Sequence, residues 1–264
     1  MFRITILLVL LQINSAYADL HWQPVPTAPD PHHKRGAKTL LLTDLDETQP
    51  VEIVLIHSDL TRSDLSHDSA TIQLKPTGKN SYHALFAQQH SEGLEVSAIR
   101  YIYLNGRPVD ASPQELLNET TSRLQIIPAP LPREHWKYES RNSYFFKILF
   151  DGNPLASHPI LASTSFGSSQ IMHTNEDGIV TLTIPEDFPK IIVQRNATPP
   201  GELRLFTSIE ADGTRHETSL SAPYRVSPQN WKSASLGFLF IGFGALTGLL
   251  LIRKLPAYNR RKRS

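Results

Sequence analysis

The run SYFFKILFDGNPLASHPILASTSF, residues 143–166, is followed by HTNEDGIVTLTIP at residues 173–185, and together they carry the clearest structural pattern in this chain. Along residues 144–150, Phe146, Ile148 and Phe150 fall on one face of an extended chain and Lys147 and Leu149 on the other, which predicts a strand with an apolar face. Turn-forming residues separate this strand from two further expected strands, at residues 160–166 and 179–184. Short strands joined by tight turns are typical of an antiparallel β-sandwich.

Two motifs in this stretch resemble those of the carboxypeptidase-regulatory-like, transthyretin-like domains, and within that group the DUF4198 proteins. The matching residues are Gly152, Pro154, Leu155, Thr174, Asn175, Gly178, Leu182 and Ile184. The resemblance implies an exported β-protein, and some members of the group are associated with nickel or cobalt uptake. The motifs are turn and core signals, so they specify a fold and imply no catalytic residue or metal ligand.

The rest of the body has the same character, which predicts an all-β fold of two antiparallel β-sandwich domains. Residues 39–127 form the expected N-terminal domain, with strands and one short helix. Residues 128–140 contain closely spaced prolines and predict a linker, and residues 141–227 form the transthyretin-like domain. The expected strands not yet named are residues 51–56, 70–74, 81–86, 94–104, 122–127, 190–194, 202–209 and 218–226, and the expected helix is residues 113–121.

The N-terminus has the features of an export signal. Arg3 precedes a short apolar run, and residues 16–18 read Ala-Tyr-Ala, which is an A-x-A cleavage motif. Residues 1–18 are therefore predicted to be a signal peptide. Residues 19–38 are polar and rich in proline, which predicts a flexible leader.

The C-terminus has the features of a membrane anchor. Residues 233–252 carry no charge and, as a helix, are long enough to cross a bilayer, whereas residues 253–264 are strongly basic. The positive-inside rule then places the basic tail in the cytoplasm and the bulk of the chain outside it. Gly244 and Gly248 form a G-x-x-x-G pair, which allows close approach of two helices and suggests a homodimer.

The composition narrows the class of protein. The chain has no cysteine, which excludes disulfides, thiol nucleophiles and cysteine metal sites. Its formal net charge is +1 with the basic excess in the tail, so nothing indicates a nucleic-acid surface. An exported chain without cysteine indicates a bacterial envelope protein in the inner membrane, with its bulk in the periplasm. No catalytic sequence motif is present, which predicts that the protein is not an enzyme.

A metal site is predicted at the processed N-terminus. Cleavage after Ala18 would leave Asp19, Leu20 and His21 as the first three residues. A free α-amine, two backbone amides and a third-position imidazole offer four nitrogen ligands in a plane, which suits Cu(II) or Ni(II). His32 and His33 lie close behind and could add ligands. The alternative is that His21 occupies the third position by chance, because the chain is rich in histidine.

Two functions follow from these features. The first is a non-enzymatic, membrane-anchored periplasmic protein that acts as a binding or accessory subunit of an envelope assembly, with an inner-membrane or periplasmic protein as partner. The alternative is a metal-binding accessory protein for uptake of nickel, cobalt or copper.

Overall fold

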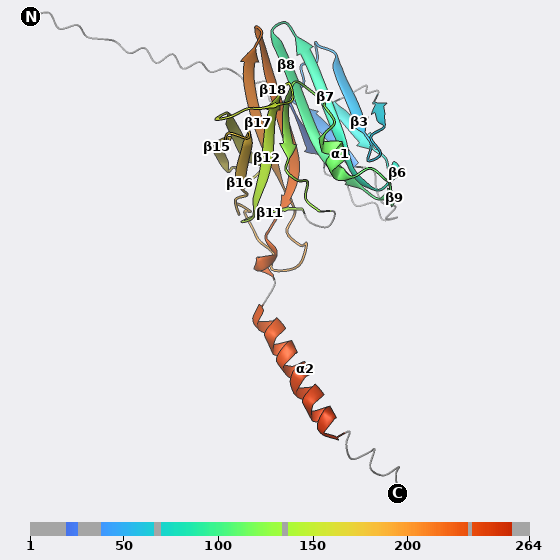
Figure 1. Ribbon diagram of the computed structural model, residues 1–264, viewed down its shortest axis with the longest axis vertical. Helices are drawn as coiled ribbons and strands as arrows, with labels where there is room; N and C mark the ends of the chain where they lie inside the picture. The colour runs from blue at the N-terminus through green and yellow to red at the C-terminus, as the bar shows by residue number, and fades with distance from the viewer. Residues whose placement is uncertain (1–19, 26–37, 66–69, 134–136, 232–233, 255–264) are drawn as a thin grey trace, which may run out of the picture.

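The computed structural model describes residues 20–25, 38–65, 70–133, 137–231 and 234–254. The predicted signal peptide lies outside these residues, and so does the predicted basic tail from residue 255 onward; residues 253 and 254 end the last helix. The body is built of β-strands, with one short helix, α1 (Pro113–Leu117), and one 3-10 turn, η1 (Pro228–Asn230). A longer helix, α2 (Ala234–Lys254), follows the body (Figure 1). The all-β prediction is confirmed for the body.

A single large sheet runs through the whole body. Within the described residues it has nine strands. They are β15 (Ser169–His173), β14 (Pro159–Thr164), β17 (Gly201–Ala211), β18 (Thr214–Arg225), β8 (Leu94–Leu104), β7 (Ser81–Ser91), β3 (Val51–Ile56) and β4 (Arg62–Asp64) in spatial order, with β11 (Tyr138–Glu139) also paired to β18.

The prediction of two separate domains, residues 39–127 and 141–227, is wrong, because β8 pairs with β18. These strands pair in parallel from Leu94↔Arg215 to Ile99↔Leu220, so strands from both predicted domains share one ladder of backbone hydrogen bonds. The two paired segments lie about 120 residues apart in the chain, and local sequence patterns carry no signal for such a pairing.

Two smaller sheets cover opposite faces of the large one. The first contains β1 (His21–Pro24), β2 (Lys38–Thr43) and β5 (Thr71–Leu74). The second contains β10 (Leu124–Pro128), β12 (Ser143–Phe150), β13 (Asn153–Pro154) and β16 (Ile179–Thr183). A minor pair, β6 (Gly78–Lys79) and β9 (Gly106–Arg107), lies apart from both.

Strand β3 shows how the layers are held together. Ile53 and Leu55 belong to the hydrophobic cluster under the β1–β2–β5 sheet, while Val54 and Ile56 belong to the cluster under the β10–β12–β16 sheet. Successive side chains of a strand point to opposite faces, so β3 is buried on both. The body therefore has three layers of sheet around two hydrophobic clusters.

The predicted flexible leader is wrong where the structure describes it. Leu20 and Trp22 are 2% and 1% exposed, and Trp22 donates a hydrogen bond from Nε1 to the carbonyl of Ala98. These two apolar side chains share one face of the extended chain, and His21, which lies on the other face, is 5% exposed, so the start of β1 is buried on both faces. Residues 26–37 of the predicted leader lie outside the described residues.

The predicted linker, residues 128–140, is also part of the body. Pro128 ends β10, which pairs with β12, and Tyr138 begins β11, which pairs with β18. The side chains of Leu131 and Tyr138 are buried. The prolines shape a connection between two sheets and do not separate two domains.

One predicted strand, residues 190–194, does not form. This part of the chain is a loop between β16 and β17. Asp187, near its start, accepts hydrogen bonds from the hydroxyls of Thr164 and Tyr224, which fix the loop to β14 and β18.

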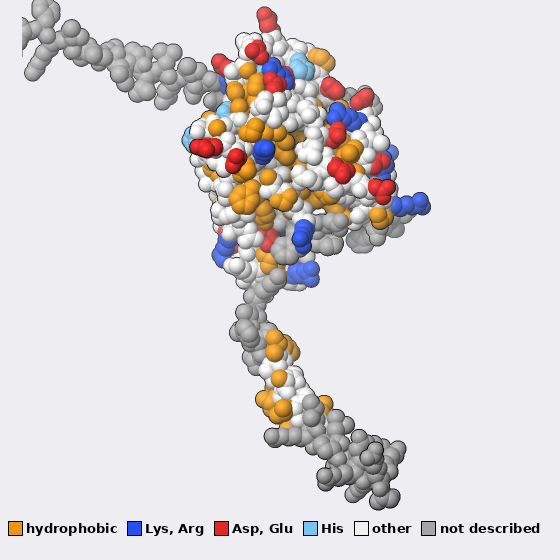
Figure 2. Space-filling view, viewed as in Figure 1, with side chains coloured by type: hydrophobic (Ala, Val, Ile, Leu, Met, Phe, Trp, Pro, Cys, Tyr) orange, Lys and Arg blue, Asp and Glu red, His pale blue; other side chains and the backbone are white. Residues whose placement is uncertain are grey.

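Helix α2 forms over the predicted anchor. Its apolar side chains are exposed wherever they are described, including Phe240, Ile241 and Phe243 (Figure 2). Among the described residues, no helix reaches the combined length and hydropathy needed to span a membrane.

Candidate binding cleft

The large sheet opens between β8 and β18. The two strands pair as far as Ile99↔Leu220, and then β18 pairs with β11 at Tyr224 and Arg225 while β8 continues to Leu104. A cavity of about 330 Å³ fills this opening. We call it the fork cleft, and its volume is at the lower end of the range for small-molecule sites, roughly 300–1,000 Å³.

The walls of the fork cleft combine aromatic, aliphatic and cationic side chains. Four tyrosines line it, namely Tyr82, Tyr101, Tyr103 and Tyr138. Its cations are Lys38 from β2, Arg100 from β8 and Lys137 beside β11. No aspartate or glutamate is among its described lining residues, so the cleft is a cationic site on an apolar base.

The three cations differ in how their charge is balanced. Arg100 donates two hydrogen bonds to the Glu202 carboxylate, at 2.6 and 3.2 Å. Lys38 donates from Nζ to the carbonyl of Tyr103 at 3.0 Å, which is a neutral acceptor. The charge of Arg100 is therefore neutralised by the ion pair with Glu202. The hydrogen bond from Lys38 to a carbonyl does not neutralise the charge of Lys38.

The pKa values of both lysines reflect this imbalance. Although part of its side chain is exposed, loss of hydration lowers the pKa of Lys38 to about 8, helped by the positive charges of Arg100 and Lys137. Loss of hydration and the charge of Arg225 lower the pKa of Lys137. An anion bound between the two lysines would relieve this repulsion.

Two buried hydroxyls in the cleft walls lack partners. Ser221 Oγ and Tyr138 Oη are inaccessible and make no hydrogen bond within the described part of the chain. Burial raises the pKa of Tyr138, as do the nearby hydroxyls of Tyr82 and Tyr101. An unsatisfied buried polar group costs about 1–3 kcal/mol, so these two hydroxyls lower the stability of the fold.

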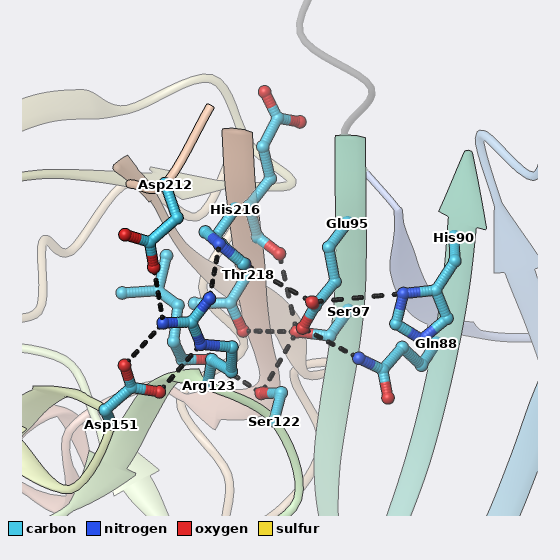
Figure 3. A network of polar contacts seen from close by, with 12 residues as sticks. Gln88, His90, Glu95, Ser97, Ser122, Arg123, Asp151, Asp212, His216 and Thr218 are labelled. Atoms are coloured by element: carbon cyan, nitrogen blue, oxygen red, sulfur yellow. Dashed lines mark hydrogen bonds and ion pairs between the residues drawn. The ribbon is translucent and has the colours of Figure 1, made fainter. Parts of the chain in front are cut away.

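A second polar cluster lies at the other end of β8 and β18 (Figure 3). Arg123 donates to both carboxylate oxygens of Asp151, at 2.8 and 2.6 Å, and to Asp212 at 3.2 Å. His216 lies between Arg123 and Glu95: its Nε2 is 3.5 Å from the guanidinium, and its Nδ1 is 3.3 Å from the carboxylate. The latter contact has an ion-pair distance but is not aligned as a hydrogen bond.

The contacts of this cluster serve to hold strands together. Both ring nitrogens of His216 face charged protein groups, and its ring is 2% exposed and packs on Phe150. Neither nitrogen is thus directed at a substrate, as a general base would have to be. The contacts join β8 and β18 to the segments that begin β10 and end β12.

His21, the central ligand of the predicted metal site, is buried in β1. Its imidazole accepts from the side-chain amide of Gln23 at 2.8 Å and lies 3.3 Å from the guanidinium of Arg204 and 3.6 Å from Asp44. A planar four-nitrogen site would require this ring to turn toward its own backbone amides. The contacts to Gln23, Arg204 and Asp44 compete with that arrangement.

The other predicted ligands cannot be placed around it. Leu20 is buried, and its carbonyl accepts a hydrogen bond from Ser219. Asp19, His32 and His33 lie outside the described residues. Among the residues that are described, no group of three histidine, aspartate or glutamate side chains could hold a metal ion. The copper or nickel site stays a prediction.

Comparison with known proteins adds distant structural likenesses, among them two bacterial adhesins. No protein-family profile matches the chain, and no curated protein matches its sequence. One solved structure, from work on host cell surface retention of a 1.5-MDa bacterial ice-binding adhesin, is 9% identical with a TM-score of 0.27. Another, of a Ca²⁺-stabilized adhesin that helps an Antarctic bacterium bind ice, is 9% identical with a TM-score of 0.26.

These likenesses are too weak to carry a fold or a function. Each covers 73% of this chain, which spans 58% and 44% of the two matched chains. The resemblance to DUF4198 and transthyretin-like domains stays a prediction based on the motifs at residues 143–185.

Proposed function

We propose that this chain is a non-enzymatic, membrane-anchored binding protein of the bacterial envelope, which holds its ligand in the fork cleft and serves as an accessory subunit. The composition of the cleft carries the proposal. Lysines with no carboxylate among the described lining residues, together with an apolar, tyrosine-lined base, can recognise a ligand by charge and burial.

The anchor in this proposal is α2. A helix that is apolar on all sides is suited either to a protein core or to a bilayer. The described side chains of α2 are exposed instead of packed against the body, and basic residues follow the helix in sequence. These features support insertion into the inner membrane with the body in the periplasm.

The absence of cysteine in the chain provides a direct test of this topology. Single cysteines introduced by Ser169→Cys in the body and Ser264→Cys in the tail would be probed with a membrane-impermeant maleimide. We expect Ser169→Cys to react in intact spheroplasts and Ser264→Cys to react only after lysis. Reaction of the tail in intact spheroplasts, or release of the chain by alkaline carbonate, would contradict the anchor.

The accessory role requires a membrane partner. After chemical cross-linking in cells and extraction in mild detergent, the full chain should be recovered in a defined complex with an inner-membrane or periplasmic protein. Recovery of the chain only as a monomer or as a dimer of itself would argue against this role. A dimer through the Gly244–Gly248 face is sterically open, since a Cβ at either glycine would meet no atom within 4 Å.

A further inference from the structure

The charge pattern of the fork cleft indicates which ligands it can accept. Lys38 and Lys137 line the same cavity, and no lining carboxylate is described that could neutralise them. A cationic ligand would be repelled, and a neutral one would leave the two lysines, which are both exposed residues, to the solvent. An anionic group placed between the lysines would restore balance.

The walls around these lysines require the ligand to have an apolar part as well. Leu131, Leu220 and Ala222 are buried along the cleft, and the rings of four tyrosines complete its surface. A volume of about 330 Å³ suits one chain or one ring system more than a branched or two-chain molecule.

The position of the cleft in the chain adds a third observation. Residues 221–223 of β18 line it, β18 ends at Arg225, and α2 begins at Ala234. The intervening residues 226–233 can extend over at most roughly 30 Å, at about 3.5 Å per residue. If α2 enters a membrane, the cleft lies close to the surface of that membrane.

We infer that the fork cleft binds a single-chain organic anion, with an anionic head such as a carboxylate between Lys38 and Lys137 and an apolar body against the tyrosine-lined wall. This inference rests on the proposed binding function and names its ligand class. It makes the protein a carrier or sensor of anionic amphiphiles at the membrane surface.

The test uses the full chain in nanodiscs of zwitterionic phosphatidylcholine. A diazirine derivative of decanoate is added and photoactivated, and labelled peptides are mapped by mass spectrometry. We expect labels in residues 100–103 and 220–223, and we expect excess decanoate to compete at least tenfold better than decanol or decyltrimethylammonium. Labelling confined to α2, or equal competition by the cationic amphiphile, would overturn the inference.

Charge-removing variants localise the anionic head. The double variant Lys38→Met, Lys137→Met keeps much of the apolar stem of each side chain and should reduce labelling of the cleft at least tenfold. Lys75→Met with Lys190→Met removes two exposed lysines outside the cleft and should leave labelling unchanged. Equal loss in both double variants would contradict the assignment.

A measurement on the unaltered chain covers the case in which the double variant does not fold. Because the pKa of Lys38 is about 8, raising the pH from 7.5 to 10.5 removes its charge while decanoate stays ionised. Cleft labelling should fall several-fold, and unchanged labelling would contradict the inference. Absent cleft labelling together with the expected cysteine topology and a recovered complex would reject this ligand class and leave the accessory role standing.

Discussion

Single hydroxyls in this protein differ sharply in how well they are satisfied. Tyr138 and Tyr224 are both buried, yet the Tyr138 hydroxyl has no partner among the described residues, while that of Tyr224 donates to Asp187. Removing an unsatisfied hydroxyl removes a desolvation cost, whereas removing a bonded one leaves its partner unpaired. The two tyrosines thus form a matched pair for measuring these opposite effects.

We predict that Tyr138→Phe leaves the free energy of unfolding unchanged or raises it by up to about 1 kcal/mol, and that Tyr224→Phe lowers it by about 1–3 kcal/mol. Denaturant unfolding of the two variants against the parent chain measures both values. A loss in Tyr138→Phe as large as that in Tyr224→Phe would show that the Tyr138 hydroxyl has a partner.

The buried His83 gives the fold an acid sensitivity. Burial lowers its pKa to about 4 from 6.5, and the nearby ring of His57 adds to this effect. Between these two values the unfolded chain binds a proton that the folded chain does not, so stability falls as the pH drops from about 6.5 to 4. Above pH 6.5 this contribution is absent.

We predict that His83→Gln reduces the loss of stability between pH 6.5 and 4 by about 2–3 kcal/mol, from 1.36 kcal/mol per unit of pKa shift. The free energy of unfolding is measured at both pH values in the parent and the variant. His173→Gln, at an exposed position, serves as control and should keep the acid sensitivity of the parent. An unchanged pH dependence in His83→Gln would contradict this assignment.

At the scale of elements, strands with a local signal could be predicted and strands defined by distant partners could not. β3 and β8 have the predicted bounds. Asp212 and Gly213, both with positive φ, form the tight turn that joins β17 to β18. β1 was missed because prolines dominate its surroundings, although the alternation of Leu20 and Trp22 was visible.

The burial of β1 leads to a prediction about that element. Trp22→Ala should lower the free energy of unfolding by about 3–5 kcal/mol, because it removes a fully buried ring under the β1–β2–β5 sheet. Gln73→Ala, at an exposed position of β5 in the same sheet, should change it by less than about 0.5 kcal/mol. If both substitutions had similarly small effects on the free energy of unfolding, β1 would not contribute to the fold, as expected for a flexible leader.

On the scale of the whole molecule, the sheet shared through β8 and β18 makes the body one folding unit. We predict a single unfolding transition, with coincident loss of far-ultraviolet and near-ultraviolet circular dichroism. Leu85→Ala in one hydrophobic cluster and Ile148→Ala in the other should both shift this same transition to lower denaturant concentration. Two separable transitions, each moved by only one of the substitutions, would restore the two-domain interpretation.

The candidate cleft depends on the same long-range joint, which explains why the sequence did not reveal it. Lys38, Arg100, Lys137 and Ser221 come from four separate parts of the chain and have no characteristic spacing. Their proximity arises because β18 leaves β8 after Leu220 and meets β11 instead. The sequence patterns predict functional features at the two ends of the chain, whereas the cleft forms only when distant segments come together in the tertiary structure.

The parallel pairing of β8 with β18 also sets an order of events during biosynthesis. β8 is complete at Leu104, but its partner segment starts only at Arg215, more than one hundred residues later. For a chain that emerges across the membrane at the rate of its synthesis, about 5–20 residues per second, the β8 edge waits roughly 5–20 s for its neighbour. An unpaired strand edge is prone to aggregation, so the nascent protein has a defined interval in which a chaperone would protect it.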